Sequence, residues 1–168
     1  MIRLICTFGG VGLLRPAPGT WGSLAAVALA VAAYEAGLAL AVPVAALLAT
    51  LAGFRAVPRY LAGRADKDPS EVVIDEVAGQ WLALCFTLIP LWQHRVEALT
   101  FGDWPGWVVP VVLFRLVDIS KPWLVGRADR RHDAKGVMLD DLWAGLFAGI
   151  GSVILAAIYH IWLKPMMG

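Results

Sequence analysis

Charged residues are scarce in this chain. Only 16% of its 168 residues are Asp, Glu, Lys or Arg, whereas 60% are apolar, and the mean hydropathy is +0.72. A soluble domain of this size carries nearer to about a quarter charged residues. The shortage of charge therefore argues against a soluble globular protein and favours insertion into a membrane.

Other features are also missing. No basic run interleaved with aromatic residues occurs, and the net charge is +1, so we expect no nucleic-acid partner. The two cysteines, Cys6 and Cys85, stand far apart in apolar stretches, which predicts free thiols rather than a disulfide framework. The first residues lack a charged leader followed by a small-residue cleavage site, so we expect no removable signal peptide.

Long apolar stretches take up most of the chain. They cover approximately residues 24–42, 44–57, 77–92, 107–117 and 142–163, and none shows the two-residue alternation of a half-buried strand. A helix that crosses a bilayer needs roughly 20 apolar residues. The last stretch meets this length, whereas the fourth is short enough to be re-entrant or packed within the protein. The pattern predicts an all-α, polytopic membrane bundle of about four to five helices, forming one domain over residues 1–168.

The basic residues give this bundle an orientation. If all five stretches cross the membrane from a cytoplasmic N-terminus, all of the 14 Lys and Arg residues except Arg95 and Lys164 lie on or near the cytoplasmic side. Such an excess sets the topology of a membrane protein. The polar segments 1–23, 58–76 and 118–141 are then expected on one face, where their side chains can form one site.

Two of these segments end in adjacent acids at the start of an apolar stretch. Asp75 and Glu76 stand in VVIDEVAGQW, and Asp140 and Asp141 stand in GVMLDDLWAG. Acids at helix N-termini often only complement the helix dipole, for roughly 0.3–1 kcal/mol each. Two such pairs on one side of a membrane favour a second interpretation, because crowded carboxylates repel one another and resist burial. A Mg²⁺ ion bound through oxygen ligands relieves both problems.

The fourth stretch ends in FRLVDISKPW. Arg115, Asp118 and Lys121 are spaced three apart, so they share one face of a helix. One interpretation is an ordinary intrahelical ion pair beside a lysine that reaches toward water. The other is a phosphate clamp, with Arg115 as a bidentate donor, Lys121 as a point charge and Asp118 as a ligand of metal or water.

The first polar segment contains TFGGVGLLRPAPGTWGSLAA, which is rich in Gly and Pro and has no acid. Backbone N–H groups of such a loop, followed by a helix start, can bind an anion. Thr20 and Ser23 stand at that helix start, where they could cap the helix or contact a substrate. The segment lacks the lysine and the spacing of a nucleotide-binding loop, so a structural turn is the alternative.

Taken together, RPAPGTWGSLAA (15–26), DPSEVVIDEVAGQW (68–81) and FRLVDISKPW (114–123) leading into GVMLDDLWAG (136–145) resemble the phosphatidylglycerophosphatase A family. The resemblance covers most of the chain. It implies a Mg²⁺-dependent phosphatase of the bacterial inner membrane that converts phosphatidylglycerophosphate to phosphatidylglycerol. One departure stands out, because the family's Gly-Gly-x-Gly run is replaced by Asp133, Ala134, Lys135 and Gly136.

The resemblance also implies that the acids of these motifs are the functional ones, namely Asp68, Asp75, Glu76, Asp118, Asp140 and Asp141. Together with the arguments from spacing and charge, this gives the following expectations. The acids expected to be catalytic are Asp75, Glu76, Asp118, Asp140 and Asp141. The expected metal ligands are Asp75, Glu76, Asp140 and Asp141. The residues expected to contact the lipid substrate are Arg115, Lys121, Thr20, Ser23 and Asp68.

Several other chemistries fit the sequence less well. Neither cysteine is followed six residues later by an arginine, and no histidine is placed for a phosphohistidine intermediate. A metal-activated water attacking phosphorus is the mechanism that remains, with an aspartyl-phosphate as an open alternative. The rival function is an ion- or proton-coupled transporter that uses its acids as relay sites. A non-catalytic membrane subunit is a third possibility, but it predicts fewer clustered acids.

Overall fold

A computed structural model describes residues 1–94 and 105–163, and throughout these ranges the chain is helical or irregular, without a strand. The all-α prediction is confirmed. The elements are α1 (Ile2–Cys6), η1 (Val11–Leu13), α2 (Pro18–Glu35), α3 (Ala41–Leu61), α4 (Ile74–Gln93), α5 (Pro105–Ser120), α6 (Trp123–Asp129), α7 (Ala134–Ile158) and η2 (Tyr159–Leu163). The five longest helices correspond to the five apolar stretches, and α1 and α6 are additional short helices in the polar segments.

Several helix boundaries differ from the apolar stretches; α7, for example, begins at Ala134, ahead of the fifth stretch. The first stretch extends to residue 42, but α2 ends at Glu35, because Gly37 adopts a left-handed backbone (φ 74°) that terminates helices. Helix α3 then begins at Ala41 rather than after Pro43. Proline is tolerated in a first helical turn, where its missing N–H has no intrahelical acceptor. The apolar pattern alone therefore placed this break too late.

Three helices are long and apolar enough to cross a membrane: α3, α4 and α7 extended to Ile161. They differ in how far protein covers them. The most apolar window of α4 is 61% buried within the protein, compared with 33% for α3 and 28% for α7. Large apolar side chains of α3 and α7 are exposed, among them Leu47, Leu48 and Ile154. Helix α4 is therefore the centre of the bundle, and its neighbours present apolar faces suited to lipid.

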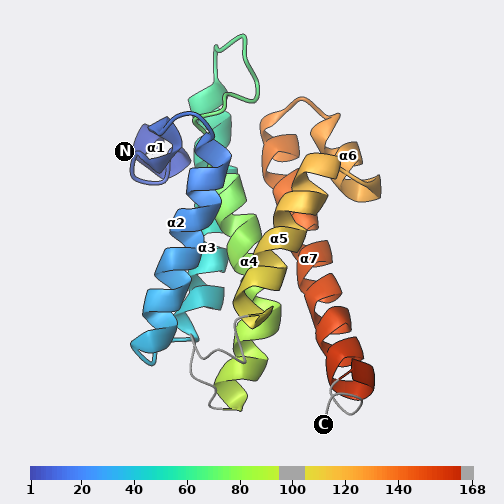
Figure 1. Ribbon diagram of the computed structural model, residues 1–168. Coiled ribbons are helices and arrows are strands. Elements are labelled where there is room, and N and C mark those ends of the chain that lie inside the picture. The colour runs from blue at the N-terminus through green and yellow to red at the C-terminus, as the bar shows by residue number, and fades with distance from the viewer. Residues whose placement is uncertain (95–104, 164–168) are drawn as a thin grey trace.

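The arrangement around α4 is shown in Figure 1. Helices α2, α3, α5 and α7 all pack against it, and α6 packs against α7. Helix α5, which the sequence predicted to be re-entrant or packed within protein, lies against α4 and α7 on one side. Its other side is exposed at Val108, Val112 and Leu116. The helix is thus covered on one face only.

The three polar segments lie at one end of the bundle. In Figure 1, α1, the loop between α3 and α4, and α6 are all at the top. Two hydrogen bonds join the first two segments: Val73 N–H donates to the Cys6 carbonyl (2.9 Å), and Arg15 Nη1 donates to Ser70 Oγ (3.1 Å). The expected convergence of these segments is therefore present. Arg95 and Lys164, expected on the opposite side, lie outside the described residues.

Candidate active site

A cavity of about 280 Å³ opens at this end of the bundle, between α2, α4, α5 and α7. Nine of the ten residues predicted for the site line it, namely Thr20, Asp68, Asp75, Glu76, Arg115, Asp118, Lys121, Asp140 and Asp141. The tenth, Ser23, does not line the cavity. It is buried in α2, about one helical turn beyond Gly19, and its hydroxyl has no hydrogen-bond partner among the described residues.

The two acid pairs share one local geometry. Asp75 Oδ1 accepts a hydrogen bond from the N–H of Glu76, and Asp140 Oδ1 accepts one from the N–H of Asp141, both at 3.0 Å. Each pair thus uses its first acid to bind a backbone N–H of its own helix. The two pairs differ in their place along the helix: Asp75 and Glu76 stand in the first turn of α4, whereas Asp140 and Asp141 lie about two turns inside α7, whose N-cap is Asp133. The expectation that the second pair stands at a helix start is therefore wrong.

Close packing of α4 and α7 brings the two pairs together. A Cβ added to Gly145 would lie 2.9 Å from the carbonyl carbon of Gly79, and one added to Gly79 would lie 2.9 Å from that of Asp141. Glycine at both positions therefore lets the two backbones touch. Since Gly79 and Gly145 stand four residues after Asp75 and Asp141, this contact sets the acids side by side about one helical turn away.

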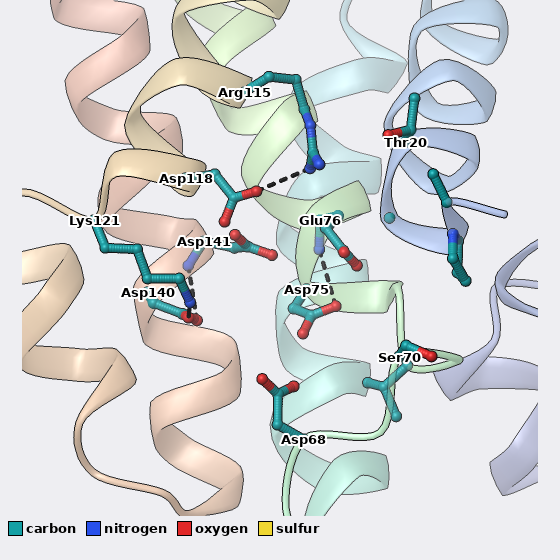
Figure 2. A pocket seen from close by; sticks show the side chains of 14 residues that line it. Thr20, Asp68, Ser70, Asp75, Glu76, Arg115, Asp118, Lys121, Asp140 and Asp141 are labelled. Carbon is teal, nitrogen blue, oxygen red and sulfur yellow. Dashed lines mark hydrogen bonds and ion pairs between the residues drawn. The ribbon is translucent and has the colours of Figure 1, made fainter.

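Three of the acids form one group. Carboxylate oxygens of Asp75, Glu76 and Asp141 lie within 4.8 Å of one another, and Asp75 and Asp141 are 5% and 4% exposed (Figure 2). Glu76 Oε2 and Asp141 Oδ1 are buried and have no hydrogen-bond partner among the described residues. Buried carboxylates this close are stable only when protonated or paired with a cation. The all-oxygen donor set fits a hard divalent cation.

Asp140 takes a different position from the other predicted metal ligands. It lies outside the three-acid group, and its Oδ2 accepts a hydrogen bond from Lys121 Nζ at 3.0 Å. The adjacent residues Asp140 and Asp141 point about 100° apart around α7, so they face different neighbours. In this structure Asp141 faces the acids of α4, whereas Asp140 faces the lysine that follows α5.

Arg115 and Asp118 form the intrahelical ion pair that their spacing predicts. Arg115 Nη1 donates to Asp118 Oδ2 at 2.9 Å, and both side chains line the cavity. Figure 2 shows Arg115 extending over the space between Asp118 and Thr20. A guanidinium has five N–H donors. A single bond to Asp118 leaves donors for a phosphate, so the ion-pair and clamp interpretations are compatible.

Lys121 is held by two carboxylates. Its Nζ donates to Asp140 and to Asp129, which ends α6. Burial alone would lower the pKa of Lys121, but the hydrogen bonds from its ammonium to Asp129 and Asp140 raise it above its ordinary value. The side chain is therefore a permanent cation at the edge of the cavity.

The first turn of α2 forms the wall opposite α7. Pro18 occupies the first turn of α2, and Thr20 and Gly19 line the cavity beside it. A Cβ added to Gly19 would collide with the carboxylate of Glu76 and lie 3.0 Å from its Cδ. The backbone at Gly19 therefore packs directly against the Glu76 carboxylate. No side chain caps the N-terminus of α2.

The loop between α3 and α4 supplies Asp68 and Ser70. Partial burial and the nearby Asp129 and Asp66 raise the pKa of Asp68, against the lowering effect of Lys121. A second set of contacts fixes the loop, because Tyr60 and Arg64 both donate to Glu71 Oε1, at 3.0 and 3.1 Å. The loop is thus held to α3 while Asp68 faces the acid group across the cavity.

The departure from the family's glycine-rich run has a structural explanation. Asp133 is the N-cap of α7, and its Oδ1 accepts a hydrogen bond from the N–H of Gly136 at 2.7 Å. A Cβ on Gly136 would lie 2.7 Å from the Ala128 carbonyl oxygen, so this glycine is needed. The chain keeps the glycine that packing requires and gains a capping acid three residues earlier. Lys135 is exposed.

Three contributors to the site were missed from the sequence. Ser70 lines the cavity, Gly19 packs against Glu76, and Asp129 binds Lys121. Asp129 stands eight residues beyond Lys121, across Pro122, and no helical periodicity links two residues separated by such a corner. The sequence shows Gly19 within PGTWGS, but nothing in it indicates that this glycine packs against Glu76.

Comparisons with known proteins point to one family for the chain as a whole. The family model described as Phosphatidylglycerophosphatase A matches residues 4–156. Phosphatidylglycerophosphatase A of Haemophilus influenzae is 30% identical over 159 residues, which cover 94% of this chain and 89% of the relative. Phosphatidylglycerophosphatase A of Escherichia coli is 34% identical over 96 residues, covering 56% of this chain and 47% of the relative.

A third relative has a different name. A protein of Bacteroides thetaiotaomicron, named as a candidate phosphatidylinositol-3-phosphatase, is 33% identical over 157 residues. The match covers 88% of this chain and 88% of the relative. No solved structure matches the chain significantly. The names of all three relatives describe phosphatases of phospholipids, and they differ in the headgroup named.

Proposed function

The chain belongs to the phosphatidylglycerophosphatase A family, and we propose that it hydrolyses phosphatidylglycerophosphate to phosphatidylglycerol and inorganic phosphate. It is a phosphatase with apolar helices suited to a membrane. The observation that carries the proposal is the buried group of Asp75, Glu76 and Asp141, whose oxygens lie within 4.8 Å of one another at the base of an open cavity.

Charge supports a metal ion in this group. Six acids line the cavity and only two cations do, the acids being Asp68, Asp75, Glu76, Asp118, Asp140 and Asp141 and the cations Arg115 and Lys121. A dianionic phosphate would be repelled by that surplus of negative charge. We assign Mg²⁺ to Asp75, Glu76 and Asp141, since it suits a site of few carboxylates with retained waters. When bound, Mg²⁺ would neutralise charge on the phosphate and lower the pKa of water.

The protein's own side chains account for the rest of the reaction. Hydrolysis joins a water oxygen to phosphorus and breaks the bond from phosphorus to the glycerol oxygen, which leaves with a proton as an alcohol. Arg115 and Lys121 would hold the equatorial phosphate oxygens, where charge develops. Asp118 and Asp68 line the cavity outside the three-acid group, so they are placed to accept a proton from the attacking water.

The surroundings of the cavity suit a lipid headgroup. A volume of about 280 Å³ is near the lower end of small-molecule sites, large enough for a headgroup but not for acyl chains. The exposed apolar faces of α3 and α7 leave the acyl chains to the bilayer. We propose that the protein lies in the bacterial inner membrane. The cavity would then open at the cytoplasmic face, because Lys and Arg are in excess in the segments at that end.

The position of the acids disfavours the rival function. A transporter that used its acids as relay sites would need them along a path through the membrane. The acids that line the cavity gather toward the end of the bundle where α4 begins (Figure 1), and Figure 2 shows them around one cavity. An acid group confined to one end fits hydrolysis at a surface.

Phosphate release from purified lipid tests the proposal. The full-length chain, purified in detergent, is given phosphatidylglycerophosphate with Mg²⁺, and released phosphate is measured. We expect turnover that stops in excess chelator and returns when Mg²⁺ is added back. Phosphatidic acid and phosphatidylinositol 3-phosphate, assayed in parallel, report the headgroup preference, and we expect phosphatidylglycerophosphate to have the highest kcat/KM.

An inactive variant guards against a contaminating phosphatase. Asp141→Asn keeps the shape of the side chain but removes a charge from the three-acid group, so the same preparation should release no phosphate. Full activity in chelator, or equal activity in this variant, would contradict the proposal. A preference for phosphatidylinositol 3-phosphate would retain the lipid phosphatase but replace its substrate.

A further inference from the structure

Lys121 reaches the cavity from an unusual backbone position. It follows α5 directly, and both Lys121 (φ 46°) and Trp123 (φ 42°) adopt the left-handed conformation that side chains other than glycine rarely take. Pro122 stands between them. Strained residues of this kind persist where the surrounding structure over-determines them, and they gather at functional sites. This corner turns the chain from α5 into α6.

The packing of α6 fixes the corner. Gly126 is buried, and a Cβ added to it would collide with the Lys121 carbonyl and lie 3.2 Å from Arg130 Nη1. Helix α6 in turn packs against α7. The backbone of Lys121 is therefore held in place. Its ammonium, at the end of a flexible four-carbon side chain, still needs a partner to give it one direction.

Asp129 gives that direction from outside the cavity. It ends α6 and accepts a hydrogen bond from Lys121 Nζ, yet it does not line the cavity that Lys121 lines. It lines instead a neighbouring cavity of about 220 Å³, whose wall includes Asp68 and Asp140 of the first. Asp129 thus contacts the ammonium from the neighbouring cavity, outside the three-acid group.

The second partner of Lys121 lies next to the group assigned to the cation. Asp140 is adjacent to Asp141 and lies at the edge of the group assigned to the cation. A divalent cation attracts a neighbouring carboxylate and competes with the lysine for it. If Asp140 turns toward the cation, Asp129 is the acid that still holds Lys121 at the rim.

We propose that Asp129 is a positioning residue, which aims the Lys121 ammonium at a phosphate bound in the cavity. This inference rests on the proposed phosphatase function. Asp129 touches neither the substrate nor the three-acid group, and its effect passes through Lys121 alone. A structural role for the same acid, such as stabilising α6, would not depend on whether Lys121 is present.

A double-mutant cycle separates these two roles. The variants are Asp129→Ala, Lys121→Met and the pair combined, each as the full chain in detergent with Mg²⁺ and phosphatidylglycerophosphate. Asp129→Ala should lower kcat/KM by roughly ten- to a hundredfold, the range for loss of a charge-assisted hydrogen bond. In the Lys121→Met background, the same change should cause no further loss. Asp129→Asn keeps an acceptor and should lose less.

Inorganic phosphate gives a readout that does not need turnover. Binding of phosphate to the Mg²⁺-loaded protein should raise the thermal unfolding temperature of the wild type, and the shift should shrink equally in Asp129→Ala, Lys121→Met and the double variant. Asp133→Asn is the matched control. It changes an acid that also lines the neighbouring cavity but binds Arg131 and Gly136, and it should leave the kinetics and the shift unchanged.

Two results would overturn the inference: wild-type kinetics in Asp129→Ala, or an equal loss from Asp129→Ala with and without Lys121. Failure of the proposed function looks different, because the wild type would then release phosphate from none of the three lipids. In that case the phosphate-dependent thermal shifts still decide whether Asp129 acts through Lys121.

Discussion

Gly79 and Gly145 meet backbone to backbone where α4 crosses α7, and a Cβ on Gly145 would lie 3.0 Å from the Gly79 Cα. This contact lies about one turn beyond the acids of both helices. It determines how closely Asp75 and Glu76 approach Asp141. The acid group is therefore a product of helix packing as much as of the acids themselves.

Adding a methyl group at this crossing should separate the helices. Gly145→Ala is expected to destabilise the protein by about 1–3 kcal/mol, the usual effect of overpacking, and to lower phosphatase activity. Gly151→Ala is the control on the same helix, because its Cβ would meet only the flexible end of Leu113, at 3.2 Å. Thermal unfolding in detergent measures both. Equal stability in the two variants would contradict the packing argument.

Neutralising one acid of the group should separate catalysis from stability. Asp141→Asn is expected to reduce kcat by about a hundredfold or more, as loss of a group that stabilises the transition state does. Without Mg²⁺ its unfolding temperature should equal or exceed that of the wild type, since the change relieves repulsion between buried carboxylates. The rise in unfolding temperature that Mg²⁺ gives the wild type should disappear.

Glu35→Gln is the control for this experiment. Glu35 ends α2, at the end of the bundle away from the cavity, and it is exposed. The variant should keep both its activity and its response to Mg²⁺. A Mg²⁺-induced shift that survives in Asp141→Asn would place the cation elsewhere.

The contact between Gly19 and Glu76 predicts an effect at a residue that carries no charge. In Gly19→Ala the new methyl group would occupy the position of the Glu76 carboxylate and push it away from Asp75 and Asp141. We expect kcat/KM to fall on the order of tenfold while the unfolding temperature changes little, because geometry lost at a site costs more activity than stability. Wild-type kinetics would show that Glu76 has room to move without harm.

Thiol labelling tests the orientation of the bundle. Single cysteines at Ser70 and Asp133 lie in two of the polar segments, and a cysteine at Ala36 lies in the turn between α2 and α3 at the opposite end. In a Cys6→Ala, Cys85→Ala background, a membrane-impermeant maleimide should label Ser70→Cys and Asp133→Cys from the cytoplasmic side only. Ala36→Cys should react from the other side. Opposite labelling of Ser70→Cys and Asp133→Cys would contradict the shared face.

The native thiol of Cys6 offers a test by pH. Burial raises the pKa of the Cys6 thiol to about 11, and the negative charge of Asp75 adds to the rise. At pH 8 its reactive thiolate is then roughly two hundredfold scarcer than in an ordinary thiol of pKa about 8.5. In a Cys85→Ala background, iodoacetamide should react slowly with the folded protein and rapidly after denaturation, and the native rate should keep rising above pH 9. A rate that levels off near pH 9 would indicate an exposed thiol.

Much of the fold could be predicted from the sequence. The apolar stretches predicted the five longest helices. A chain segment in lipid must satisfy its backbone hydrogen bonds internally, and an α-helix does so within one segment. The excess of basic residues predicted that the three polar segments share one end, and Figure 1 shows them there. Helix ends were less accessible, since α2 stops at a left-handed glycine inside an otherwise continuous apolar stretch.

The sequence by itself determined which chemical groups the site contains. The two pairs of adjacent acids, and Arg115, Asp118 and Lys121 at helical spacing, follow from local order along the chain, although only the pair in α4 stands at a helix start. Only the tertiary structure decided which of those groups contact one another. Asp141 lies with the acids of α4, Asp140 binds Lys121, and Asp129 binds Lys121 from α6. The reason is geometric, because neighbours on a helix diverge by about 100°. Their partners depend on the glycine contacts that set the distance between helices.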